Sequence, residues 1–322
     1  MIARIAPALA LLLFGIGDAG AVTLRVGPGP GADHLTLQAA IDALPGEGGT
    51  LSISPGTYRE KLMIAKPGVK LLGTGKRPQN VVLVWGDSNK SAGGTGKSAS
   101  VWASGDGFEA RNLTIQNDYH LNNADRSQAV ALRVTADRAV LSHVRLLGAQ
   151  DTLYAASKNP DSPSRQLFEH CYIEGHVDFI FGDAKAFFDR CEIHGIANEI
   201  VMITAQSRVK PEQDSAYVFD RCRITADREV GELWLGRAWR PHATVIFMRT
   251  RIDAPLQPAG WREWTPGKTD TFSTATYREF ASSGQGASVA AREPSSRQLT
   301  KAEAANWSRA RFLSGVDGWR PR

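Results

Sequence analysis

Two aspartates, Asp151 and Asp178, lie in matching sequence settings. Each follows a glycine and two further residues and precedes an apolar run, in GAQDTLYA (148–155) and GHVDFIFG (175–182). Two carboxyl groups held close together repel each other as anions, so the pKa of one of them rises. Such a pair supplies an acid and a base near neutral pH, which general acid–base and nucleophilic catalysis require.

An internal repeat indicates how the chain brings these aspartates together. FEHCYI, FDRCEI, FDRCRI and FMRTRI begin at Phe168, Phe188, Phe219 and Phe247, and the weaker units ARNLTI and LSHVRL precede them in the same phase. Uneven spacing with in-phase strands favours a right-handed parallel β-helix, in which loops vary while strands keep their register. An antiparallel sandwich would also use alternating strands, but a recurring Phe/Cys/Ile ladder is less expected there.

The register of the repeat predicts that the two aspartates are neighbours. Asp151 lies five residues after Leu146, and Asp178 lies five residues after the equivalent Ile173. Both should therefore occupy the same place on successive coils, about 4.8 Å apart. By the same count Asn198 continues the polar ladder on the next coil. Polar ladders also occur in β-helix turns for structural reasons, but stacked aspartates repel and favour a functional site.

Two short helices are expected to cap the stack, because the ends of a β-helix expose unpaired strand edges. Residues 35–44 have apolar side chains at helical spacing, and Thr300 with Glu303 forms a capping box before AEAANWSRARFL. The predicted fold is thus an all-β, single-stranded parallel solenoid with short capping helices. It occupies one domain, residues 22–322.

Residues 1–21 are predicted to be a secretory signal peptide. Arg4 supplies a basic start, IAPALALLLFGIG (5–17) an apolar run, and AGA (19–21) a cleavage site of small residues. A buried N-terminal strand or helix is the alternative, whereas the apolar run is too short to cross a bilayer. We therefore expect a secreted or periplasmic protein without a membrane span.

Composition and cysteine content are consistent with an exported globular protein. The 322 residues are 42% hydrophobic and carry a net charge of +5. A basic exported protein suits a polyanionic ligand, although an ordinary surface excess of Lys and Arg would give the same charge. Cys171 and Cys191 share a ladder position, so they could form a disulfide or remain an unoxidised ladder, with Cys222 as a buried thiol.

Several other functions lack their sequence signatures. GTGKS (94–98) resembles the end of a phosphate-binding loop, but Ser91 stands where its first glycine is needed. The serine-hydrolase motif G-x-S-x-G and the metal motif H-E-x-x-H are both absent from the sequence. We therefore expect no metal or other cofactor and no nucleic-acid partner, and we expect a monomer.

Several motifs together resemble carbohydrate esterase family 8, the pectin methylesterases. GAQDTLY, GHVDFIFG and LGRAW (235–239) occur in that family's order and rough spacing, and GTYRE (56–60), QAVALRV (128–134) and FLSGVDGW (312–319) also fit. The resemblance covers nearly the whole chain after the signal peptide. It implies hydrolysis of galacturonate methyl esters in methylesterified homogalacturonan, giving pectate and methanol without a cofactor.

The resemblance also implies roles for individual residues. Asp178 matches the nucleophile, and Asp151 matches the residue that protonates methanol and then activates water. Gln128 and Gln150 match the two glutamines that stabilise the oxyanion, a role that calls for fixed hydrogen-bond donors. Arg237 matches the arginine that orients the nucleophile, although a purely structural ion pair would look the same in sequence.

Substrate-binding residues follow from the same comparison and from the ladder. Trp239 resembles the family's sugar-stacking tryptophan, and Thr95 resembles a substrate-contacting threonine. Tyr154 and Phe181 lie three residues after each aspartate, so they should stack and could flank a groove or simply fill the core. One departure is visible, because Ala238 replaces the proline of the common LGRPW motif.

Three competing functions remain open on the sequence. A polygalacturonase or pectate lyase would also use a β-helix and acidic side chains, but glutamines beside the aspartates favour acyl chemistry. An esterase-like relative could act on a different ester. A sugar-binding β-helix without catalysis would not need an intact set of Gln, Asp and Arg residues.

Overall fold

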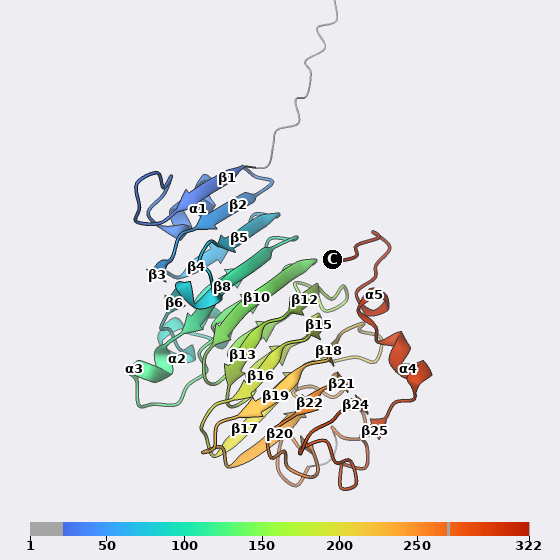
Figure 1. Cartoon of the computed structure of the whole chain (residues 1–322). Helices are drawn as coiled ribbons and strands as arrows, with labels where there is room; N and C mark the ends of the chain where they lie inside the picture. The colour runs from blue at the N-terminus through green and yellow to red at the C-terminus, as the bar shows by residue number, and fades with distance from the viewer. Residues whose placement is uncertain (1–21, 269–270, 322) are drawn as a thin grey trace, which may run out of the picture.

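The computed structural model describes residues 22–268 and 271–321, so the predicted signal peptide lies outside the described residues. Parallel strands wind into a β-solenoid of about nine turns, which confirms the predicted fold class (Figure 1). No helix among the described residues is long and apolar enough to cross a membrane.

The strands belong to two sheets that run along the solenoid. The small sheet contains β4 (Leu62–Ile64), β7 (Val101–Ala103), β9 (Leu132–Val134), β11 (Leu153–Ala155), β14 (Ile180–Gly182), β17 (Ile200–Gln206), β20 (Glu232–Arg237) and β23 (Trp261–Arg262). The large sheet contains β1 (Thr23–Val26), β2 (Gly49–Ile53), β3 (Gly56–Arg59), β5 (Val69–Gly73), β6 (Val81–Trp85), β8 (Glu109–Asn117), β10 (Ala139–Leu147), β12 (Arg165–Glu169), β13 (Tyr172–Gly175), β15 (Lys185–Asp189), β16 (Glu192–Gly195), β18 (Ala216–Asp220), β19 (Arg223–Ala226), β21 (Thr244–Met248), β22 (Arg251–Ile252), β24 (Thr276–Phe280) and β25 (Arg297–Gln298).

Short helices occupy the loops and the two ends of the chain. They are α1 (Leu37–Ala43), η1 (Pro78–Asn80), α2 (Asn89–Ala92), η2 (Thr95–Ser98), α3 (Tyr119–Asn122), α4 (Lys301–Asn306) and α5 (Arg309–Phe312). The Gly/Ser-rich loop before β7 thus contains both α2 and η2.

The Phe/Cys/Ile repeat forms the core of the large sheet. Phe168, Phe188, Phe219 and Phe247 are register partners on successive coils, and their ring centroids lie 4.7, 4.4 and 4.5 Å apart. All four are fully buried. Because side chains alternate between the two faces of a strand, this ladder points inward along its whole length. The stacked rings fix the register that also positions the site.

The cysteine ladder is unoxidised. Cys171, Cys191 and Cys222 are all buried free thiols, so the predicted alternative of a Cys171–Cys191 disulfide is not formed. Each thiol approaches a carbonyl of the preceding coil, as Cys191 Sγ does at 3.4 Å from Phe168 O. Parallel strands hold equivalent side chains side by side at about 4.8 Å. A disulfide needs Cβ atoms that converge to about 3.8 Å.

The terminal helices take two different places. Leu37, Ala40 and Ile41 of α1 pack into the solenoid core, and α1 lies beside β1 and β2 at the N-terminal end. Thr300 does form the predicted capping box with Glu303. However, α4 and α5 pack against the outer face of the large sheet and do not cap an end (Figure 1). Their partners are the residues next to the inward phenylalanines, namely Leu167, Phe187, Val218, Ile246 and Met248.

The register at the aspartates is largely as predicted. Leu146 pairs with Ile173, and Leu153 pairs with Ile180, so Asp151 and Asp178 stand at equivalent places on successive coils. The prediction for Asn198 is wrong.

An insertion between β16 and β17, on the coil that follows Asp178, causes this error. Ile180 comes five positions after Gly175, but its partner Thr204 comes nine positions after Gly195, the partner of Gly175. Counting back two residues from Thr204 therefore places Met202 beside Asp178. Asn198 instead turns within the inserted loop and donates to the carbonyl of Ile200 at 2.7 Å.

Candidate active site

A cleft on the outer face of the small sheet contains all nine predicted site residues. It has a volume of about 290 Å³. Three further residues, Gly96, Ala205 and Trp264, also line it. The predicted members are Thr95, Gln128, Gln150, Asp151, Tyr154, Asp178, Phe181, Arg237 and Trp239. Residues from four coils and three loops thus converge on one space.

Asp151 and Asp178 share an uncommon backbone conformation. Each stands two residues before a small-sheet strand, with φ values of 66° and 52°. Non-glycine residues seldom adopt this left-handed region, and it costs about 1–3 kcal/mol unless the surroundings impose it. Both side chains are almost buried, with exposed fractions of 8% and 6%. The solenoid register therefore holds two carboxyl groups, in strained turns, at the floor of one cleft.

The two carboxyl groups have different electrostatic surroundings. Burial raises the pKa of Asp151 well above its ordinary value, and the charge of Asp178 raises it further. Burial also raises the pKa of Asp178, but the hydrogen bonds and charge of Arg237 oppose this shift. Among the described residues, Asp151 has no side-chain hydrogen bond or ion pair of its own. The arrangement favours a protonated Asp151 beside an ionised Asp178.

Arg237 binds Asp178 with both arms of its guanidinium. Its Nε donates to Oδ1 at 2.9 Å and its Nη2 donates to Oδ2 at 2.7 Å. Arg237 lies on β20, two coils beyond β14 in the small sheet. Ala205 stands between Phe181 and Arg237 in that column, and its methyl group leaves room for the arginine to reach across. The guanidinium also lies over the ring of Trp264, whose centroid is 4.3 Å from Arg237 Cζ.

Two glutamines line the cleft together with the carboxyl pair. Gln150 directly precedes Asp151, and Gln128 stands in the loop before β9. Asn89 of α2 fixes Gln128 twice, because its backbone N–H donates to the Gln128 carbonyl at 2.8 Å and its side-chain amide donates to Oε1 at 3.2 Å. The N–H₂ group of Gln128 therefore remains available as a donor in the cleft. No motif in the sequence indicated this role of Asn89.

Aromatic rings form one wall of the cleft. Tyr154 and Phe181 pair in register and stack with centroids 4.3 Å apart, as predicted. Trp239 lies 6.0 Å from Phe181, and Trp264 lies 6.5 Å from Trp239. Flat rings along a groove suit the apolar faces of sugar rings. Sequence reasoning missed Trp264, which belongs to an irregular loop without a motif.

The same column of the small sheet continues beyond Tyr154. Arg133 is its register partner, and Trp102 is the partner of Arg133 on the coil before. The Arg133 guanidinium lies 4.1 Å from the Trp102 ring centroid and 5.4 Å from that of Tyr154. The aromatic surface therefore extends along the solenoid axis past the carboxyl pair, as a polymer-binding groove requires.

The donor set of the cleft fits acyl chemistry. It offers an anion fixed for attack, a neighbouring carboxylic acid and amide donors at one side. Within the described ranges 22–268 and 271–321, no three His, Cys, Asp or Glu side chains are grouped so as to hold a metal ion.

The fold and the cleft together correspond to a carboxylic ester hydrolase built on a β-solenoid. The Pectinesterase family model matches residues 25–316, and the chain belongs to this family. Pectinesterase 31 of Arabidopsis thaliana is 34% identical over 304 residues, covering 90% of this chain and 92% of that protein.

Solved structures give the same result. The pectin methylesterase from carrot is 29% identical, with a TM-score of 0.82 over 90% of this chain and 92% of that one. Pectin methylesterase PemA from Erwinia chrysanthemi is 26% identical, with a TM-score of 0.78 over 92% and 98%.

Proposed function

We propose that this protein hydrolyses the methyl esters of galacturonate residues in pectin, giving pectate and methanol, with Asp178 as nucleophile and Asp151 as acid and base. The observation that carries the assignment of roles is the bidentate Arg237–Asp178 pair beside an Asp151 of raised pKa. Family membership supports the ester substrate, and a related pectin methylesterase has been solved in complex with a hexasaccharide.

The first half of the reaction forms an acyl-enzyme. A carboxylate oxygen of Asp178 attacks the ester carbonyl carbon, and the carbonyl oxygen becomes an oxyanion. The side-chain amides of Gln128 and Gln150 donate hydrogen bonds to that oxyanion. When the tetrahedral intermediate collapses, the carbon–methoxy bond breaks and Asp151 gives its proton to the departing oxygen. Methanol leaves, and galacturonate remains joined to Asp178 as a mixed anhydride.

The second half releases the acid. Asp151 is now a carboxylate and takes a proton from a water molecule as the water oxygen attacks the anhydride carbonyl. A second oxyanion forms at the same amides and collapses with Asp178 as the leaving group. The galacturonate leaves as a free acid, and Asp151 is protonated again. No cofactor enters either half.

The aromatic wall would bind the sugar chain. Trp239, Tyr154 and Phe181 present ring faces along the groove, and Thr95 contributes a hydroxyl at its edge. We expect the enzyme to act as an exported monomer on the polysaccharide. A polygalacturonase or lyase on the same scaffold would cut the chain and would have no use for amide donors placed at an acyl oxygen.

The test measures three products from highly methylated pectin in parallel. These are methanol, new reducing ends and the absorbance of unsaturated sugars, for the wild type and for Asp178→Ala. Methanol without chain cleavage, lost in the variant, supports both the activity and the nucleophile. Cleavage without methanol would assign the protein to the chain-cutting enzymes. Hydrolysis of a different ester, without methanol release from pectin, would show that the protein is an esterase with another substrate.

A further inference from the structure

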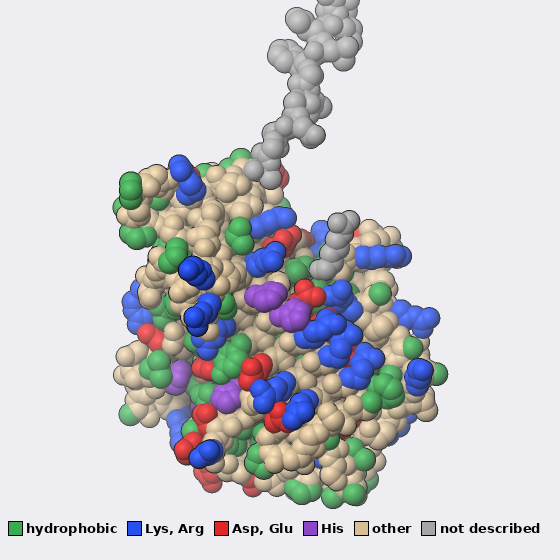
Figure 2. Space-filling model, in the orientation of Figure 1, with side chains coloured by type: hydrophobic (Ala, Val, Ile, Leu, Met, Phe, Trp, Pro, Cys, Tyr) green, Lys and Arg blue, Asp and Glu red, His purple; other side chains and the backbone are tan. Residues whose placement is uncertain are grey.

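A second, larger groove lies on the outer face of the large sheet and shares no residue with the catalytic cleft. Its volume is about 710 Å³. It crosses the coils that contain β5, β8, β10, β13 and β16, and basic side chains gather on this face of the molecule (Figure 2). The small sheet with its cleft forms a different side of the solenoid. The groove is therefore spatially separate from the cleft.

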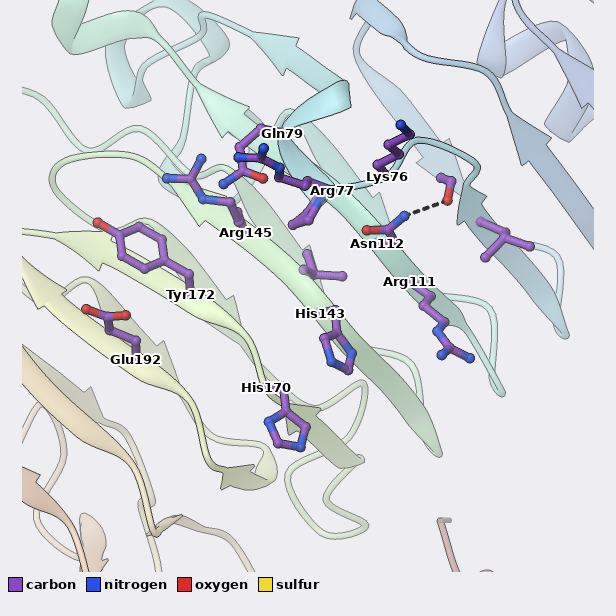
Figure 3. Close-up of a pocket in the computed structure, with 14 residues that line it drawn as sticks. Lys76, Arg77, Gln79, Arg111, Asn112, His143, Arg145, His170, Tyr172 and Glu192 are labelled. Atoms are coloured by element: carbon purple, nitrogen blue, oxygen red, sulfur yellow. Dashed lines mark hydrogen bonds between the residues drawn. The ribbon is translucent and has the colours of Figure 1, made fainter.

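Four cationic side chains line this groove without a carboxylate partner. Lys76 and Arg77 come from the loop after β5, Arg111 comes from β8, and Arg145 comes from β10 (Figure 3). Among the residues that the structure describes, none of the four forms an ion pair. Glu192 is the acidic residue of the lining, and it accepts a hydrogen bond from a threonine hydroxyl. The groove thus keeps an uncompensated positive charge.

On the same outer face of the large sheet, arginines on later coils are paired with carboxylates. There Arg221 lies 3.0 Å from Asp189, and Arg249 lies 2.6 Å from Asp220. Both aspartates are nearly buried, so these arginines are held and neutralised by carboxylates built into the strands. Basic side chains on these later coils are thus paired with carboxylates, whereas the four at the groove are not, and an external anion could supply the missing charge there.

Two histidines extend the groove along the solenoid axis. His143 and His170 occupy equivalent left-handed turns on adjacent coils, with φ values of 54° and 51°, and their rings stack 5.1 Å apart (Figure 3). Burial lowers the pKa of His143, and the charges of His170 and Arg111 lower it further, as expected in a positive field.

The remaining lining suits a sugar polymer. Tyr172 presents a ring beneath Arg145, whose guanidinium carbon lies 4.8 Å from the ring centroid. Gln79 adds an uncharged amide that can bond hydroxyls, and Asn112, whose N–H₂ donates to the carbonyls of Gly73 and Gly75, adds its amide oxygen as an acceptor. The four cations come from neighbouring coils, with Lys76 and Arg77 in one loop and Arg111 and Arg145 three positions apart along the strands, so they surround the groove and match a ligand with several negative charges.

We propose that this groove is a non-catalytic site for a de-esterified, anionic stretch of galacturonan. The proposal rests on the proposed function, since the product of the cleft is a polymer with one carboxylate per sugar. A chain bound here by its demethylated part keeps methylated parts at high local concentration near the cleft. Charge complementarity with the four unpaired cations selects the product over the neutral methyl ester.

The test is direct binding of de-esterified galacturonate oligomers to the whole protein. Titration calorimetry measures affinity, and hydrogen exchange locates protection. The variant is Arg111→Gln with Arg145→Gln. Its control is Arg223→Gln with Arg251→Gln, which removes the same charge from the same face but affects arginines already paired with Asp253.

We expect protection at residues 76–79 and 143–145, separate from any at the cleft, and roughly tenfold weaker binding there in the variant. The control should bind like the wild type. Fully methylated oligomers should give no protection at the groove, and inorganic phosphate should not compete at equal charge concentration.

Three results would overturn the proposal. They are protection confined to the cleft, equal weakening in variant and control, or equal competition by phosphate. Methanol release from a short methylated oligomer, measured on the same samples, tests the function separately. If the wild type releases no methanol, the proposed function is refuted. If the wild type is active but its groove binds no galacturonate, only this inference is refuted.

Discussion

Arg237 on β20 and Asp178 in the turn before β14 lie two coils apart and meet through two hydrogen bonds of 2.9 and 2.7 Å. A bidentate pair fixes the plane of the carboxylate as well as its charge. In a nearly buried setting this contact opposes the effect of burial on the pKa of Asp178, while Asp151 has no such partner. One arginine thus distinguishes two aspartates that the solenoid places equivalently.

Replacing Arg237 should change the pH dependence as well as the rate. Without the guanidinium the pKa of Asp178 rises, so the nucleophile is protonated at pH values where the wild type is active. We expect Arg237→Gln to lower kcat about 100-fold and to move the acid limb of the kcat/KM profile to higher pH. Arg237→Lys keeps a charge but loses the second hydrogen bond, so its acid limb should move less. An unchanged acid limb in both variants would contradict this role.

The charge of Asp178 should be measurable at Asp151. In Asp178→Asn the neighbouring negative charge is absent, so the pKa of Asp151 should fall toward its ordinary value while remaining raised by burial. Carbon-13 NMR of labelled aspartate carboxyls, recorded against pH, measures this pKa directly. The variant forms no acyl-enzyme, so the titration is free of turnover. A pKa of Asp151 that stays constant or rises would show that the two carboxyls do not interact.

Asn89 is predicted to position Gln128. Removing the amide in Asn89→Ala frees Gln128 Oε1 and lets the side chain rotate away from the oxyanion. We expect kcat to fall about tenfold with little change in KM, compared with about 100-fold in Gln128→Ala. Steady-state kinetics of both variants and of the double variant provide the check. If the two effects simply multiply in the double variant, Asn89 does not act through Gln128.

The phenylalanine ladder should dominate stability. Phe219 is fully buried between Phe188 and Phe247, so Phe219→Ala leaves a cavity and removes two ring contacts. We expect a loss of about 3 to 5 kcal/mol in the free energy of unfolding. Urea denaturation followed by circular dichroism measures it. Leu72→Ala, at an exposed position of β5, is the control and should change stability little.

The sequence was informative wherever a residue repeats in phase. The Phe/Cys/Ile ladder predicted the solenoid, and counting from Leu146 and Ile173 placed Asp151 and Asp178 on successive coils, as the pairing confirms. This works because a parallel ladder transmits register from coil to coil through stacked, buried side chains.

The same count failed at Asn198, since four additional residues enter the loop before β17 and the sequence does not mark where register resumes. The capping box of Thr300 and Glu303 predicted a helix but could not say whether that helix would cover the end or the flank of the solenoid.

Only the tertiary structure decided which side chains contact residues of other coils. Asn89, Trp264 and the alanine that lets Arg237 approach Asp178 come from segments with no common motif. The contacts of Asn89 and Trp264 depend on where the loops fold back over the small sheet, and that of the alanine depends on the register of β17. The sequence by itself determined the ladder and, through it, the carboxyl pair, because local periodicity encodes register. The different surroundings of the two carboxyl groups, which give them different pKa shifts, could be known only from the fold, because residues far apart in the chain create them.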